Sequence, residues 1–90
     1  MKDASIVLAQ RKVNYKEAFM ERLAGGRKRK GLTQARLAKE MGVRLRSIQN
    51  WECGIAEPRG RELRKLSKIL GLSVAFLLGM DEGPPLKRNS

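Results

Sequence analysis

The sequence contains no histidine and only one cysteine, Cys53. A metal or haem site therefore has almost no ligands to draw on, and an internal disulfide is impossible. No apolar run approaches the roughly 20 residues that a membrane-spanning helix needs. The apolar stretch at residues 5–9 is short and no small-residue cleavage site follows it, which argues against a secretory signal. We therefore expect a reducing, cytoplasmic location, no cofactor, no metal and no membrane partner.

Acidic residues are also scarce. Nine Asp and Glu stand against twenty Lys and Arg, which leaves a net charge of +11. Such a charge attracts polyanions at long range, and nucleic acid is the first candidate. A basic excess alone also occurs in proteins of membrane surfaces and in merely soluble ones, so composition does not decide between these classes. The length of 90 residues suits one small domain with a single modest core.

The central region lacks both strand-like alternation and internal repeats, and its pattern predicts a compact all-α fold of five short helices. Asn14 and Glu17 are spaced as a capping box that begins a helix over about residues 15–30. Thr33 and Ser73 are N-caps of later helices, and glycines at 31, 42 and 71 are stop signals. The other predicted helices cover residues 34–41, about 45–52 and 61–70, and a short segment after Ser73. The predicted core consists of Phe19, Met20, Leu23, Leu37, Ala38, Met41, Ile48, Trp51, Leu63, Leu66, Ile69, Leu70, Val74, Leu77 and Leu78.

Three segments follow from this pattern. Residues 14–79 form the predicted domain. Residues 1–13 form an N-terminal extension, whose apolar residues 6–8 fit a strand and a helical turn equally well. Residues 80–90 contain two prolines and little to bury, so we expect a mobile tail.

The stretch from residue 32 to residue 52 joins two of these helices through Met41-Gly42-Val43. Two helices joined by a short turn that contains glycine form a helix-turn-helix unit, whose second helix fits the major groove of B-DNA. In the second helix, Ile48 and Trp51 are three residues apart and face inward. Arg46 and Asn50 point almost opposite to Ile48, so the pattern places hydrogen-bonding groups on the outer face.

Those groups suit the edges of bases. Arginine can form two hydrogen bonds to guanine, asparagine can form two to adenine, and leucine can touch a thymine methyl group. Arg44, Leu45, Arg46 and Asn50 are therefore candidates for base contacts, although Leu45 fits the edge of the core equally well. The alternative is the solvated polar face that any surface helix has. The turn glycine, the inward residues and the net charge together favour the DNA interpretation.

At this point residues 22–79 resemble a known family, the phage repressor and Cro type of helix-turn-helix domain, also called the XRE family. The resemblance rests on GLTQ at 31–34, LA at 37–38, MGV at 41–43, SIQNWE at 47–52, Gly54, Pro58, LRKLSKILGLS at 63–73 and FLLG at 76–79. It implies a five-helix domain that usually dimerises and binds operator DNA, with the third helix as the recognition helix.

The resemblance also implies roles for single residues. It places Arg44, Leu45, Arg46 and Asn50 at base-facing positions. It places the DNA backbone near Gln34, Arg36, Ser47, Gln49 and Arg59, and it pairs Arg27 with Glu52 in a salt bridge that joins the first helix to the end of the third. Apart from Leu45, each of these side chains is otherwise an ordinary polar surface residue.

Three positions depart from the family pattern. Gly26 stands where relatives usually bury a leucine, and Met20, Phe76 or the N-terminal segment are candidates to fill the space. Arg44 stands where serine or threonine commonly caps the recognition helix. Arg36 replaces a frequent acidic residue, which makes its helix more attractive to phosphate.

The leading hypothesis is a prokaryotic or phage-encoded, nucleoid-associated transcriptional regulator. It would be a repressor that binds double-stranded DNA as a homodimer. The alternative is an antitoxin-type interaction protein that binds a toxin partner and represses its own operon. An enzyme is the weakest class, because Cys53 has no candidate base beside it and no phosphate-binding glycine loop is present. For the dimer interface, Val74, Phe76 and Met80 form a candidate apolar patch, but Phe76 is equally suited to the domain core.

Overall fold

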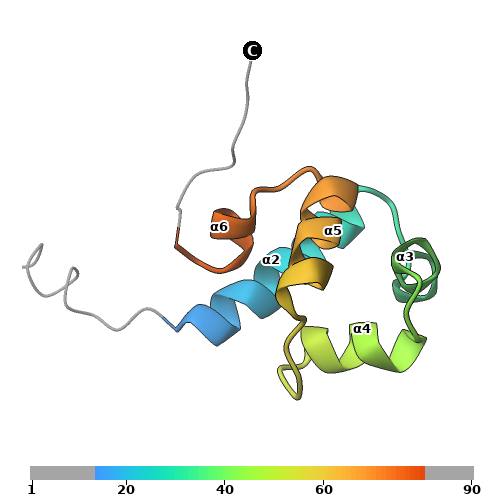
Figure 1. Cartoon of the computed structure of the whole chain (residues 1–90), viewed down its shortest axis with the longest axis horizontal. Helices are drawn as coiled ribbons and strands as arrows, with labels where there is room; N and C mark the ends of the chain where they lie inside the picture. The colour runs from blue at the N-terminus through green and yellow to red at the C-terminus, as the bar shows by residue number, and fades with distance from the viewer. Residues whose placement is uncertain (1–13, 81–90) are drawn as a thin grey trace, which may run out of the picture.

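The computed structural model describes residues 14–80, which form five helices and contain no strand (Figure 1). The helices are α2 (Tyr15–Arg29), α3 (Gln34–Met41), α4 (Leu45–Glu52), α5 (Gly60–Leu70) and α6 (Val74–Leu77). The prediction of an all-α fold is confirmed, and the helix ends that the sequence predicted lie within one residue of those observed. The predicted N-terminal extension and all but the first residue of the predicted tail lie outside the described residues.

Local side-chain bonds begin three of these helices. The side-chain oxygen of Asn14 accepts from the amide of Glu17 at 2.9 Å, and the hydroxyls of Thr33 and Ser73 accept from amides three residues later at 3.0 Å. Within residues 14–80 the reciprocal bond from Glu17 to the Asn14 amide is not formed, so the predicted capping box is only half present. These bonds satisfy amide groups that the first turn of a helix leaves without partners.

The core lies where the five helices meet. Helix α2 packs against α4 and α6, α3 packs against α4 and α5, and α5 packs against α6. Each helix contributes one aliphatic side chain with no exposed surface, and these are Leu23, Leu37, Ile48, Leu66 and Leu77. Five residues that the helical spacing predicted to be in the core are only half-buried: Met20, Leu63, Ile69, Val74 and Leu78. Leu72 was not predicted to be in the core, but it is buried although it lies between two helices.

Phe76 packs on this core from α6. The guanidinium of Arg22 lies 4.1 Å from the centre of its ring, and Nη1 of Arg22 donates to the carbonyl of Phe76 at 2.7 Å. Phe76 is therefore a partly buried residue packed against the core, and not part of a fully exposed apolar patch. The contact ties α6 to α2.

The space beside Gly26 is filled by two leucine side chains from the end of α5 and the loop after it. A Cβ atom built on Gly26 would lie 2.8 Å from Cδ1 of Leu72 and 3.5 Å from Cδ1 of Leu70. These two leucines, rather than the predicted Met20 or Phe76, are its nearest neighbours. The place of the missing side chain is therefore taken by Leu70, the last residue of α5, and by Leu72 in the loop that follows, and both approach the backbone of α2 closely.

Replacing the two adjacent glycines of α2 should have opposite effects. Alanine is more favourable than glycine inside a helix by roughly 0.8–1.0 kcal/mol. A Cβ at Gly25 meets nothing within 4 Å, so we expect Gly25→Ala to raise the free energy of unfolding by up to about 1 kcal/mol. At Gly26 the clash with buried Leu72 adds an overpacking cost of roughly 1–3 kcal/mol, so Gly26→Ala should lower it by about 1 kcal/mol. Urea unfolding of both variants measures this difference, and equal effects would show that Leu72 moves aside freely.

Candidate nucleic-acid interface

Helix α4 is held against the domain by its inner face. Ile48 is completely buried and Trp51 is 4% exposed, as their spacing predicted. The turn that precedes α4 depends on Gly42, whose φ of 74° lies in the left-handed region that favours glycine. The amide of Val43 donates to the carbonyl of Ala38 at 3.0 Å across this turn. The geometry of the turn therefore brings α4 across α3 as a helix-turn-helix.

The outer face of α4 carries the hydrogen-bonding groups. Arg44, Arg46 and Gln49 are exposed, and Ser47 and Asn50 are half-buried. Within residues 14–80, the side chains of Arg44, Arg46 and Gln49 make no hydrogen bond or ion pair with another described residue. Long cationic and amide side chains in this state are available to an external ligand.

Two of the predicted base-contacting residues lie at the beginning of α4. Leu45 is 41% exposed, so it lies outside the core and next to the basic side chains. Arg44 is the N-cap residue of α4, but its side chain makes no capping bond, because arginine has no acceptor. The first turn of α4 therefore has no side-chain cap, and the exposed guanidinium of Arg44 stands at its beginning.

A buried ion pair connects α2 to the end of α4. Nε of Arg27 lies 2.6 Å from Oε2 of Glu52, and Nη2 of Arg27 lies 3.2 Å from Oε1. Nη1 of Arg27 donates to the carbonyl of Leu32 at 2.8 Å, so three guanidinium nitrogens are bonded. The two side chains are only 10% and 9% exposed. This is the pair that the family resemblance implied, and it connects the first helix to the last turn of α4.

Gln34 belongs to the same network. Its Nε2 donates to Oε1 of Glu52 at 3.0 Å, a bond that the sequence did not predict. An amide nitrogen has two hydrogens, so the second remains free to bond a phosphate at the beginning of α3. The carboxylate of Glu52 thus positions two residues, Arg27 and Gln34, that come from different helices.

The remaining predicted backbone-contacting residues lie on other elements. Arg36, in the first turn of α3, forms an exposed ion pair with Glu40 at 3.2 Å. Arg59 precedes α5, and its amide donates to Oε1 of Glu62 at 2.7 Å while its side chain is exposed. The helix that follows carries a further set of cations, namely Arg61, Arg64, Lys65 and Lys68.

Lys65 has a structural role that the sequence did not reveal. Its Nζ donates to the carbonyl of Met41 at 3.1 Å, at the end of α3. A cation is favourable there because the last carbonyls of a helix carry partial negative charge. The two residues are 24 positions apart, and no local pattern pairs residues at that distance.

The model of the helix-turn-helix family matches residues 26–77, which is more than half of the chain. The chain belongs to this family, in its phage repressor and Cro type. The helix-turn-helix segment identified above, from α3 through the turn at Gly42 to α4, lies wholly inside the matched region. No helix among residues 14–80 of this helix-turn-helix protein is both long enough and apolar enough to cross a membrane.

Two relatives and one solved structure extend this result. The chain is 45% identical over 60 residues to the prophage-derived transcriptional regulator YonR of Bacillus subtilis, covering 67% of this chain and 56% of YonR. It is 38% identical over 72 residues to the transcriptional regulator DicA of Escherichia coli, covering 76% of this chain and 53% of DicA. The solution structure of the transcriptional repressor LexA from Eubacterium rectale has a TM-score of 0.70 at 25% identity, covering 90% of this chain and 85% of that one. The chain spans about half the length of these two relatives.

Proposed function

We propose that this protein is a sequence-specific DNA-binding transcriptional regulator, and specifically a repressor, that reads an operator through α4. The observation that carries the proposal is the two-sided character of α4. Ile48 and Trp51 hold its inner face in the core, and its outer face presents Arg44, Arg46 and Gln49 without partners in the described chain. The relatives support the assignment, since YonR and DicA are named as transcriptional regulators rather than as enzymes.

Recognition would divide between two sets of side chains. The major groove is about 12 Å wide and admits a helix with its side chains. With α4 in the groove, Arg44, Leu45, Arg46 and Asn50 meet base edges. Contacts to phosphate set the register without reading sequence. They would come from Gln34, Arg36, Ser47, Gln49 and Arg59.

We further propose that the protein acts as a homodimer on a two-fold symmetric operator in a prokaryotic cytoplasm, on the nucleoid. Dimers of this kind contact half-sites about one helical turn apart, roughly 34 Å. The antitoxin alternative gains no specific support from the relatives named above. A repressor dimer therefore remains the function that we propose.

Gel shift at increasing salt tests the proposal directly. Each phosphate that the protein neutralises should lower log K by about 0.9 per unit of log salt concentration. A protein with a charge of +11 that binds an operator should show a steep loss of affinity. When bound duplexes are selected from a random pool, one sequence should also be enriched. Binding that is insensitive to both salt and sequence would refute the proposed function.

Base-facing and backbone-facing variants should behave differently in the same selection. Arg46→Ala and Asn50→Ala should each relax the preference at one or two positions and cost about 1–3 kcal/mol on the best site, because a two-bond contact to a base is lost. Arg59→Ala should weaken binding to all sequences alike. It should also reduce the slope of log K against log salt concentration by about 1, because one phosphate contact is lost. Uniform effects from all three variants would show that the roles are assigned wrongly.

A further inference from the structure

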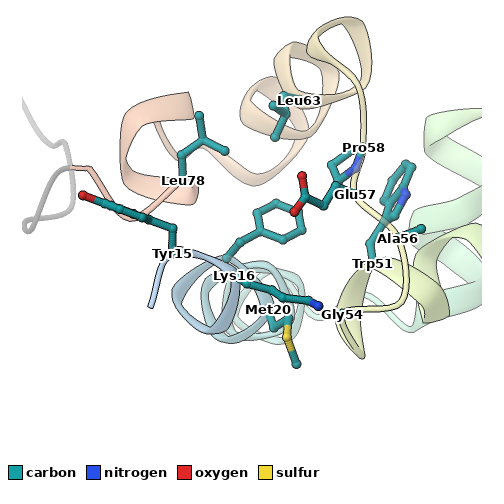
Figure 2. A pocket seen from close by; sticks show the side chains of 11 residues that line it. Tyr15, Lys16, Met20, Trp51, Gly54, Ala56, Glu57, Pro58, Leu63 and Leu78 are labelled. Carbon is teal, nitrogen blue, oxygen red and sulfur yellow. The ribbon is translucent and has the colours of Figure 1, made fainter. Parts of the chain in front are cut away.

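A small apolar pocket lies on the side of the domain where the described chain begins. It has a volume of about 140 Å³, and Figure 2 shows its walls. Tyr15, Lys16 and Met20 come from α2, Trp51 comes from the end of α4, Leu63 comes from α5, and Leu78 directly follows α6. Glu57 and Pro58, on the loop between α4 and α5, form its upper edge in the figure. Three helices, one loop and the residue after α6 thus surround a cavity that no described side chain fills.

One exposed aromatic side chain lines the pocket, and an exposed isoleucine is next in sequence to two lining residues. Tyr15, at one edge, is 56% exposed. Ile55, which is 74% exposed, lies between Gly54 and Ala56, and both of these residues line the pocket. An apolar cavity beside exposed apolar side chains is a candidate site for contact with another segment or molecule. The pocket is too small for a folded partner to enter, because a cavity of roughly 150 Å³ accommodates a group about as large as benzene. One large aliphatic side chain matches this size.

The N-terminal segment carries such side chains. Ile6, Val7 and Leu8 form its apolar centre, and the chain enters the described structure at Asn14, directly before the pocket residue Tyr15. Residues 9–13 can span roughly 17 Å when extended, at about 3.3–3.6 Å per residue. That length is sufficient to bring any of the three side chains back to a pocket whose edge is the next residue of the chain.

Tethering and charge both favour this occupant. A short linker gives the attached segment an effective concentration in the millimolar range, so even a weak apolar contact is populated. Arg11 and Lys12 lie between the apolar residues and Asn14, and the carboxylate of Glu57 stands at the pocket edge. Attraction between these cations and Glu57 would favour docking, and Lys16, which also lines the pocket, would oppose it in part.

We propose that the apolar run at residues 6–8 docks into this pocket of its own chain, with one aliphatic side chain inside and the others covering Tyr15 and Ile55. The docked segment would then cover the side of Trp51 that faces the pocket. The proposal concerns the free protein and does not depend on DNA binding. Its failure and the failure of the proposed function are therefore separate results.

Nuclear Overhauser effects (NOEs) in the unaltered chain test the docking directly. Trp51 is the only tryptophan, so its ring signals are unambiguous. Methyl groups of Ile6, Val7 or Leu8 should show NOEs to the rings of Trp51 and Phe19, both of which line the pocket. Absence of every such NOE would overturn the proposal. A sample that mixes labelled and unlabelled chains identifies the source, and NOEs seen only between chains would also overturn it, in favour of a second copy as the occupant.

A matched pair of variants gives an independent measurement. Replacing Ile6, Val7 and Leu8 together by serine should lower the thermal midpoint by roughly 4–8 °C, which is the shift that a modest loss of apolar contact produces in a domain of this size. The same variant should make Trp51 more accessible to a fluorescence quencher. Leu86→Ser, at the other end of the chain, removes an aliphatic side chain that has no part in the proposal and should change neither quantity. Identical behaviour of the two variants would refute the docking.

Discussion

Glu52→Leu is expected to lower the free energy of unfolding by about 3–5 kcal/mol, because it leaves the buried guanidinium of Arg27 without its counter-ion. Both side chains are about nine-tenths buried, so water cannot replace the lost carboxylate. The substitution also removes the acceptor of Gln34. Urea unfolding followed by the fluorescence of Trp51 measures the loss, provided that the slope of the transition is unchanged.

Two controls separate the ion pair from a general effect of charge. Glu40→Leu breaks the pair between Arg36 and Glu40, whose side chains are 64% and 36% exposed, and an exposed pair contributes no more than about 0.5 kcal/mol. The double variant Arg27→Met with Glu52→Leu removes both buried charges, so it should recover most of the loss. A double variant as unstable as Glu52→Leu alone would show that packing, and not the uncompensated charge, causes the loss.

Ile48→Ala is expected to cost about 2–5 kcal/mol of stability, because the side chain is completely buried and its removal leaves a cavity between α4 and the other helices. The same change should weaken DNA binding, since Ile48 is one of the residues that hold α4 in place. Unfolding by urea gives the first quantity, and gel shift at a temperature where the variant is still folded gives the second.

Leu45→Ala is the matched control on the same helix. Leu45 is 41% exposed, so its truncation should cost less than about 1 kcal/mol. If Leu45 touches a thymine methyl group as proposed, the variant should nevertheless lose affinity for sites that contain that thymine. A stability loss equal to that of Ile48→Ala would contradict the observed orientation of α4.

Most of the fold could be predicted because its signals are local. A capping hydroxyl such as that of Thr33 bonds an amide three residues away, and a glycine such as Gly42 ends a helix through its own φ. The spacing of Ile48 and Trp51 defines the inner face of α4 through the helical period alone. These relations lie within one turn of the chain, so they can be identified before the fold is known. The same period places Arg46 and Asn50 on the outer face of α4, whereas the base-facing roles of Arg44 and Leu45 rested on the family resemblance.

The errors arose where burial depends on neighbours from other elements. Met20 and Leu63 have the right spacing for a core, yet each lies at the wall of the pocket and is only half-buried. Leu72 has no helical period to mark it, because it lies between α5 and α6. Its burial depends on the close approach of that loop to Gly26 of α2, which only the packing of helices brings about.

The sequence by itself determined the five helices, the turn between α3 and α4, the inner and outer faces of α4 and the strong positive charge, since each depends on residue type or on spacing within a turn or two. Only the tertiary structure decided that Gln34 shares Glu52 with Arg27, that Lys65 caps α3, and that a pocket opens beside Trp51. The physical reason is that these contacts join residues many positions apart. Whether they form depends on the angles and distances between packed helices, which no local pattern encodes.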